Sequence, residues 1–355
     1  MVSVLTRRMR PTRLVIAFAL LIGPLALAGT LVAPADARVP AAVTAQPPAT
    51  AKVAATKNPA KNCKGIKFKK VKGERPAYAS KLRTYPARNA TCRAYWASGA
   101  NSDFVPQAVA IEGTTAWISG YTWPTSSNLC RIERMDLVTG QVIAQQSSIY
   151  ALKSDGTPDY YCRHGGGLTV DQYGMWISAS GELWLLSRFA IGYDPDHVVL
   201  RHWSVDQKSG VHASINTTSG GYAMLGYYSG DAAASNVSWV SQDALMKTGV
   251  NRITMNPTGP GDIAPVLQQP IRAASQGLNW YQGLVTTQCG GATFANGKHV
   301  SLIPGIEDIE FVPETKKTYL ISESGSRPLH TSGSIVPFLS EVSTKKIKQL
   351  RATHC

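Results

Sequence analysis

Short runs in which apolar and polar residues alternate, broken by Gly, Asp, Asn and Pro, dominate the chain after residue 94. Helical periodicity is hard to find there. Val, Ile, Tyr and Trp instead recur at alternate positions, which is typical of β-strands. We therefore predict an all-β body over residues 104–355.

One strand–turn–strand pattern recurs along this body: an alternating apolar strand, a polar turn, and a second strand with an aromatic or β-branched centre. Clear copies span residues 106–119, 166–178 and 307–322. Weaker copies begin near Tyr222 and at Gln282. Outer strands follow several copies, at residues 132–143, 202–210 and 339–347.

Repeats with four strands per unit are the signature of a β-propeller, in which each blade buries its faces against its neighbours. We predict five blades, or six if residues 66–100 complete another. A pair of β-sandwiches, which needs no repeat, is the alternative.

Composition agrees with a folded body, because 44% of the 355 residues are hydrophobic and only 16% are charged. These values exclude a disordered or coiled-coil chain.

The first 37 residues have the features of an export signal. Four arginines precede an apolar run at residues 14–32, and Ala35-Asp36-Ala37 matches a small-x-small cleavage site. We predict a cleaved signal peptide over residues 1–37 and no membrane span in the mature chain. A retained anchor is the alternative, because the run is long enough to cross a bilayer.

Six cysteines follow this signal, an even number that predicts disulfides formed in an oxidising compartment. Many connectivities are open to six cysteines. Zinc is disfavoured because no two of them lie close together in the sequence. We favour pairing between nearest neighbours: Cys63 with Cys92, Cys130 with Cys162, and Cys289 with Cys355.

The formal charge of +14 is unevenly distributed. Residues 38–93 hold 14 Lys and Arg against the single acid Glu74, whereas the chain from residue 94 holds 18 basic and 20 acidic residues. The Ala/Pro/Thr-rich residues 38–61 predict a disordered linker. Residues 62–103 predict a basic segment pinned by a disulfide, with a charged edge strand near its start.

Clustered lysines attract polyanions, so this arm predicts attachment to an anionic cell-envelope polymer. A solvated spacer is the alternative. Nucleic acid is disfavoured as the partner, because the chain contains no recognisable nucleic-acid-binding module.

The stretch from Gly166 to Ser178 resembles the inner two strands of an NHL-type or gluconolactonase-like propeller blade. Residues 304–313, with 320–327 after them, resemble the closing repeat of secreted actinobacterial propeller-like proteins of unassigned function. They are also similar to a blade start in paraoxonase-like calcium hydrolases. The resemblance covers residues 104–350 and implies a fold rather than an activity.

In calcium-dependent propeller hydrolases, acids and amides at the starts of inner strands hold the cation in the central channel. The resemblance therefore implies a channel site with calcium as cofactor and His164 as general base. Its other contributors would be Glu307, Asp308, Gln107 and Gln282. The alternative for Glu307 and Asp308 is a strand-capping role.

Two further motifs give weaker signals. His164 and the three glycines after it spell the oxyanion loop of some lipases, but the chain lacks the Gly-x-Ser-x-Gly turn of that fold. The glycines are then expected to allow close backbone approach. Trp117 and Trp176 occupy equivalent repeat positions and are expected in the core, whereas Trp123 is the exposed candidate for ligand stacking.

We predict a secreted, monomeric β-propeller that acts as a binding module at the cell envelope, tethered by its basic arm or bound to another extracellular ligand. The alternative is a calcium-dependent hydrolase of lactones, aryl esters or phosphoesters. We favour the non-enzymatic function.

Overall fold

The computed structural model describes residues 63–75, 84–97, 103–123, 127–153, 156–231, 234–323 and 337–354. All of them belong to the second of two units, Val53–Cys355. The predicted signal peptide and linker, at residues 1–37 and 38–61, lie outside the described residues. No helix in the described part of the chain is long and apolar enough to span a bilayer.

Five sheets of four or more strands make up the framework of the described chain. The first sheet contains β2 (Phe104–Glu112), β3 (Thr115–Thr122), β4 (Cys130–Asp136) and β5 (Gln141–Ser147). The second contains β8 (Gly167–Val170), β9 (Met175–Ala179), β10 (Glu182–Leu186) and β11 (Val199–Val205). The third contains β12 (Ile215–Ser219), β13 (Tyr222–Gly226), β14 (Asn236–Ser241) and β17 (Leu267–Pro270).

The fourth sheet contains β18 (Gly277–Trp280), β19 (Leu284–Gln288), β20 (Gly291–Thr293) and β21 (His299–Ser301). The fifth contains β22 (Ile306–Val312), β23 (Lys317–Ser322), β24 (Phe338–Ser343) and β1 (Thr91–Trp96).

Shorter elements decorate these sheets. Two strands, β15 (Arg252–Ile253) and β16 (Asp262–Ile263), extend the second sheet beyond β11 by parallel pairing. A separate hairpin is formed by β6 (Tyr150–Leu152) and β7 (Pro158–Tyr161). The helices are α1 (Gln242–Leu245), α2 (Thr344–Lys348) and the 3-10 turns η1 (Phe68–Lys70), η3 (Pro86–Ala90), η4 (Pro195–His197) and η5 (Gln207–Ser209).

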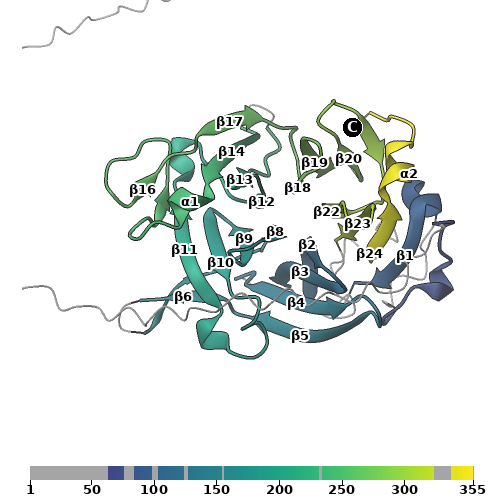
Figure 1. The fold of residues 1–355 in the computed structure, drawn as a ribbon, viewed down its shortest axis with the longest axis horizontal. Helices are drawn as coiled ribbons and strands as arrows, with labels where there is room; N and C mark the ends of the chain where they lie inside the picture. Colours follow the sequence, from purple (N-terminus) through teal and green to yellow (C-terminus); the bar gives the residue numbers. More distant parts are fainter. Residues whose placement is uncertain are drawn as a thin grey trace, which may run out of the picture. The chain divides into compact units, whose positions relative to one another are not determined.

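The first strands of the five sheets form a closed ring. β2 contacts β8, β8 contacts β12, β12 contacts β18, β18 contacts β22, and β22 contacts β2 again. Figure 1 shows the sheets arranged around this common centre. The fold is therefore a β-propeller, as predicted, and the described residues form five blades.

The last blade is closed by the start of the described chain. β1 pairs antiparallel with β24, from Thr91 opposite Val342 to Trp96 opposite Phe338. Residues 66–100 therefore do not make the sixth blade that we considered. Instead β1, within this range, completes the fifth blade, because it satisfies the hydrogen-bonding edge of β24. The propeller thus begins upstream of the predicted boundary at residue 104.

Three of the five predicted blade starts agree with the structure within two residues, and the two weak copies are displaced by one strand. The copy placed at Tyr222 begins the second strand of its blade, β13, and Gln282 precedes β19. The true first strands carry buried polar residues, Asn216 in β12 and Asn279 in β18. These residues interrupt the apolar alternation that identified the clear copies.

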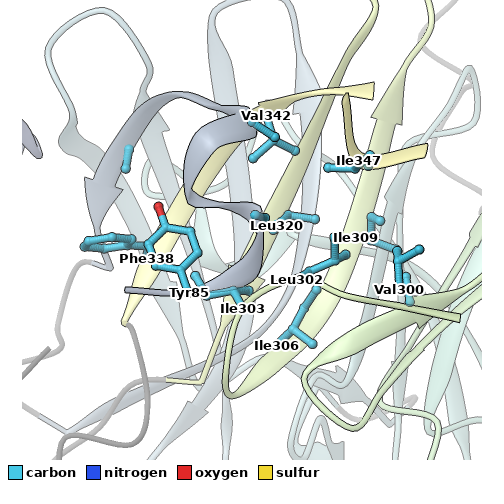
Figure 2. Close-up of a cluster of buried hydrophobic side chains, with 14 of the residues drawn as sticks. Tyr85, Val300, Leu302, Ile303, Ile306, Ile309, Leu320, Phe338, Val342 and Ile347 are labelled. Atoms are coloured by element: carbon cyan, nitrogen blue, oxygen red, sulfur yellow. The ribbon is translucent and has the colours of Figure 1, made fainter. Parts of the chain in front are cut away.

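Apolar side chains fill the space between neighbouring sheets. Figure 2 shows one such cluster, in which Val300 and Leu302 meet Ile309 and Leu320 of the last blade. Tyr85 covers this cluster from outside and meets the Phe338 ring edge-on, with ring centroids 6.2 Å apart. Burial of apolar surface between sheets is the main source of stability in such a fold.

The tryptophans predicted to be core residues are buried. Trp117 and Trp176 are both almost fully covered. Trp176 also stacks on Trp203, with ring centroids 5.6 Å apart.

Two of the three predicted disulfides are present, Cys63–Cys92 and Cys130–Cys162. Cys289 is also disulfide-bonded. Its predicted partner, Cys355, lies outside the described residues.

The lysine-rich segment differs from the predicted edge strand. It forms the 3-10 turn η1 and a single bridge between Lys72 and Tyr95. Val71 is buried, and Ile66 and Phe68 pack partly buried against the same core cluster. The apolar side chains of this segment therefore point inward and its lysines point outward, although the segment does not form a continuous ladder of strand hydrogen bonds.

Candidate functional site

A pocket of about 560 Å³ lies at the end of the propeller where the inner strands begin. Its wall includes one residue near the start of each inner strand. These residues, from the first blade to the fifth, are Gln107, Gly166, Ile215, Gln276 and Glu307. Because every blade contributes, this pocket lies on the axis of the ring, and we call it the axial pocket.

Two local irregularities line the axial pocket. The register of β2 against β3 shifts between Pro106 and Ala108, and that of β22 against β23 shifts between Ile306 and Asp308. The residues within these β-bulges are Gln107 and Glu307. Bulges re-aim side chains out of the regular pleat, which is why they recur at binding sites.

His164 is held at the rim of the pocket by contacts on both ring nitrogens. Nε2 lies 3.1 Å from the Asn128 side-chain nitrogen, and Nδ1 lies 3.1 Å from the Ser180 hydroxyl. The edge of the ring also meets Tyr121, with centroids 4.9 Å apart.

The three residues joined by these hydrogen bonds all have left-handed backbone conformations. φ is 44° at Asn128, 70° at His164 and 45° at Ser180. Such conformations cost energy in residues with a side chain, and they cluster at ligand-binding sites.

Covalent and steric constraints fix the segment that carries His164. The Cys130–Cys162 disulfide lies two residues upstream, and the His164 amide donates to the Asn128 carbonyl at 2.9 Å. The expectation of close approach at the glycines is confirmed. A Cβ on Gly166 would lie 2.3 Å from the Ser214 carbonyl oxygen, so glycine is required there.

The axial pocket carries acidic but not basic side chains. Glu307 and Glu323 contribute carboxylates, and the remaining polar groups are amides, hydroxyls and the His164 ring. Among the described residues that line it, none is Lys or Arg. This composition favours neutral or positively charged ligands over anions.

The acidic cluster of β22 is divided among three environments. Glu307 lines the axial pocket. The Asp308 Oδ2 atom accepts a hydrogen bond from the Val109 amide at 3.1 Å, so this carboxyl links the last blade to the first. Glu310 accepts from the Asn279 amide and lines a separate pocket of about 420 Å³ at the opposite end of the inner strands.

Burial raises the pKa of both inner carboxyls. Desolvation raises the pKa of Asp308 to about 8, although the backbone amides of Val109, Ile309 and Leu278 oppose the shift. Desolvation, with a smaller contribution from the charge of Asp308, raises the pKa of Glu310 to about 8.

Two predicted site residues lie elsewhere. Gln282 occupies the turn between β18 and β19, where it accepts a hydrogen bond from Lys348 Nζ at 3.2 Å. Trp123 is half-buried just after β3, and its amide donates to the Asp103 carbonyl at 2.6 Å. The place expected for Gln282 is taken by Gln276, which precedes the true first strand of that blade.

Of the residues proposed as calcium ligands, Gln107 and Glu307 line the axial pocket, whereas Asp308 and Gln282 do not. Among the described residues, no three His, Cys, Asp or Glu side chains lie close enough together to hold a metal ion. Asp308 in particular is directed at backbone amides rather than at Glu307.

Sequence analysis missed several lining residues, among them Tyr121, Tyr228, Glu323 and Ser180. They lie at the ends of second strands or in the loops that follow, not at blade starts. Glu323 directly follows β23, so the same repeat alignment could have found it one strand later.

The chain matches no known protein-family model, and no curated protein matches it either. Many solved structures resemble it at low identity. One is the WD40 domain of Neurospora crassa Pan2, with 8% identity and a TM-score of 0.29, over 61% of this chain and 59% of that one.

Two further matches have similar values. Kuenenia stuttgartiensis hydrazine synthase shows 10% identity and a TM-score of 0.33, over 74% of this chain and 88% of that one. The β-propeller domain of Myceliophteria thermophila Cps50 shows 9% identity and a TM-score of 0.30, over 66% and 72%. Structural similarities with such low sequence identity and TM-score carry no information about activity.

Proposed function

We propose that this protein is a secreted binding module whose axial pocket takes a small, polar, neutral or positively charged ligand. The observation that carries the proposal is the convergence of side chains from all five blades on one pocket. A ligand in the axial pocket would be contacted by all five blades, and small-molecule ligands usually bind in such concave pockets. The disulfides are consistent with an extracellular location.

The polar groups of the pocket support recognition rather than chemistry. Gln107 and Gln276 can both donate and accept hydrogen bonds, while Glu307 and Glu323 attract cations and accept from hydroxyl groups. The rim group His164 has both ring nitrogens in contact with neighbours. These features favour a binding site over the alternative calcium-dependent hydrolase.

Glu323→Gln is expected to weaken binding of a cationic ligand about tenfold, because it removes one of two carboxylates near the ligand. Isothermal titration with three matched kinds of ligand would measure the change: cationic amino sugars, neutral polyols and anionic sugar acids. Gln282→Ala is the control, because Gln282 lies outside the axial pocket and should leave the affinity unchanged.

A preference for anions, or equal losses in Glu323→Gln and Gln282→Ala, would contradict the proposal. The same protein titrated with calcium tests the hydrolase. A rise in melting temperature that disappears in Glu307→Gln would favour the enzyme.

We also propose that the basic arm attaches the protein to an anionic cell-envelope polymer. Within the described part of the arm, four exposed lysines surround η1: Lys64, Lys67, Lys69 and Lys70. A groove of about 630 Å³ runs beside them, and Arg93 also lines it. Clustered cations of this kind bind polyanions in a salt-dependent manner.

Replacing these four lysines by Gln is expected to lower the salt concentration that elutes the protein from isolated cell wall, with the melting temperature changed little. The lysines point away from Val71 and the core, so the fold is preserved. Deleting the arm up to residue 93 is a poorer test, since it removes Cys92 and part of β1.

Lys208 and Lys247 are exposed elsewhere, and their replacement by Gln is the control. Unchanged elution of the fourfold variant would exclude the described lysines as the tether.

A further inference from the structure

A second, chemically different pocket lies between the last two blades, at the end opposite the axial pocket. It has a volume of about 670 Å³ and is bordered by two turns and a helix. The β18–β19 turn contributes Tyr281 and Gln282, and the β22–β23 turn contributes Pro313 and Lys316. The buried Lys317 of β23 also lines the pocket, and α2 contributes Lys345 and Lys348. We call it the interblade pocket.

Its wall is aromatic. Tyr281 stacks on Phe311, with ring centroids 4.3 Å apart and an interplanar angle of 15°. Trp280 lies beside this pair and remains 39% exposed, which is unusual for so large an apolar side chain. The wall therefore offers flat apolar surface to a planar ligand.

Its rim is cationic. Lys316, Lys345 and Lys348 line the pocket and are exposed. Ile347 is buried in the core, so the helix presents Lys345 and Lys348, three residues apart, on its outer face. Among the described residues that line the pocket, none is Asp or Glu, so the three ammonium groups are not neutralised from within it.

Existing contacts hold this rim next to the aromatic wall. Lys348 Nζ lies 5.1 Å from the centre of the Tyr281 ring, and it donates to Gln282 Oε1 at 3.2 Å. Two of the lining turn residues have left-handed backbones, with φ of 55° at Gln282 and 57° at Lys316. Strained turns of this kind persist where the surrounding structure fixes them, and they cluster at ligand sites.

We propose that the interblade pocket binds a small aromatic carboxylate, with its ring against the Tyr281–Phe311 pair and its carboxylate at Lys345 and Lys348. Both features are needed for this assignment: the wall alone would take any apolar ligand, and the rim alone any anion. Charge complementarity then selects the anion among aromatic ligands. The site shares no residue with the axial pocket, so the two proposals stand independently.

The test uses 2-naphthoate as the probe in isothermal titration with the whole mature protein. The comparison ligands are 2-naphthylmethanol, which keeps the ring without charge, acetate, which keeps the charge without the ring, and 2-naphthylmethylammonium, which reverses the charge. We expect 2-naphthoate to bind tightest and its affinity to fall with added salt.

The Lys345→Gln/Lys348→Gln variant should weaken 2-naphthoate about three- to tenfold and leave 2-naphthylmethanol unchanged, because exposed ion pairs contribute modestly. Lys208→Gln is the control and should alter neither. An unchanged affinity for 2-naphthoate in the double variant, tighter binding of the alcohol or the amine, or no measurable binding of 2-naphthoate would each overturn the proposal.

Discussion

Glu341→Gln is expected to lower the free energy of unfolding by about 2–4 kcal/mol, since it leaves the buried Lys317 and the partly exposed Arg93 without their carboxylate. The Glu341 side chain is fully buried. Its Oε2 atom lies 2.6 Å from Arg93 and its Oε1 atom 3.6 Å from Lys317, whose side chain is only 10% exposed. Lys317 Nζ otherwise contacts the two sulfur atoms of the Cys63–Cys92 disulfide.

Urea unfolding with the disulfides intact would measure this change. Adding Lys317→Met to Glu341→Gln removes the ammonium group that faced this carboxylate and should recover part of the loss. Asp194→Asn is the matched control, because the pair of Asp194 with His197 is exposed to solvent and its loss should change the stability little. A loss below about 1 kcal/mol in Glu341→Gln would show that water reaches this cluster.

Asp308→Ala is expected to destabilise the protein by about 2–4 kcal/mol, because the Val109 amide loses its buried acceptor and a cavity remains. The site joins the first and last blades, so the change acts where the ring is completed. Chemical denaturation of the variant below about pH 4 would measure it, because there the carboxyl is protonated in both the folded and the unfolded chain. A change below about 0.5 kcal/mol would contradict a structural role.

Asp308→Asn separates hydrogen bonding from ionisation. The native pKa of about 8 lies above the usual value of 3.8, so the unfolded chain releases this proton first as pH rises. The contribution of Asp308 to stability is therefore complete below about pH 4 and declines up to about pH 8. Asn cannot ionise, so melting temperatures of Asp308→Asn should fall less between pH 5 and pH 8 than those of the native protein.

The fold was predictable because the same alternation of apolar and polar residues recurs in each four-stranded unit. The clearest copies are those whose first strand is apolar. β12 and β18 escaped detection because Asn216 and Asn279 are buried there for hydrogen bonds rather than for apolar packing. The pairing of β1 was also not predicted, because its partner β24 lies about 250 residues further along the chain. The ion pair between Arg93 and Glu341 joins residues that are equally far apart in the sequence.

For the channel site, the resemblance to calcium-dependent propeller hydrolases implied Gln107, His164 and Glu307, which line the axial pocket, and also Asp308 and Gln282, which do not. Sequence position could not predict the direction of neighbouring side chains. The bulge at Glu307 sends it into the pocket and leaves the adjacent Asp308 to meet the Val109 amide. A shift of one residue in register thus decides between a ligand contact and a structural link.

The pairing of β1 with β24 has a consequence for biogenesis. β1, which completes the fifth blade, leaves the ribosome early, whereas its partner β24 is among the last segments to be made. Until synthesis reaches residues 338–343, β1 has an open edge that can recruit foreign strands. We therefore expect a nascent or prematurely terminated chain, unlike the complete protein, to depend on chaperones that cover this edge.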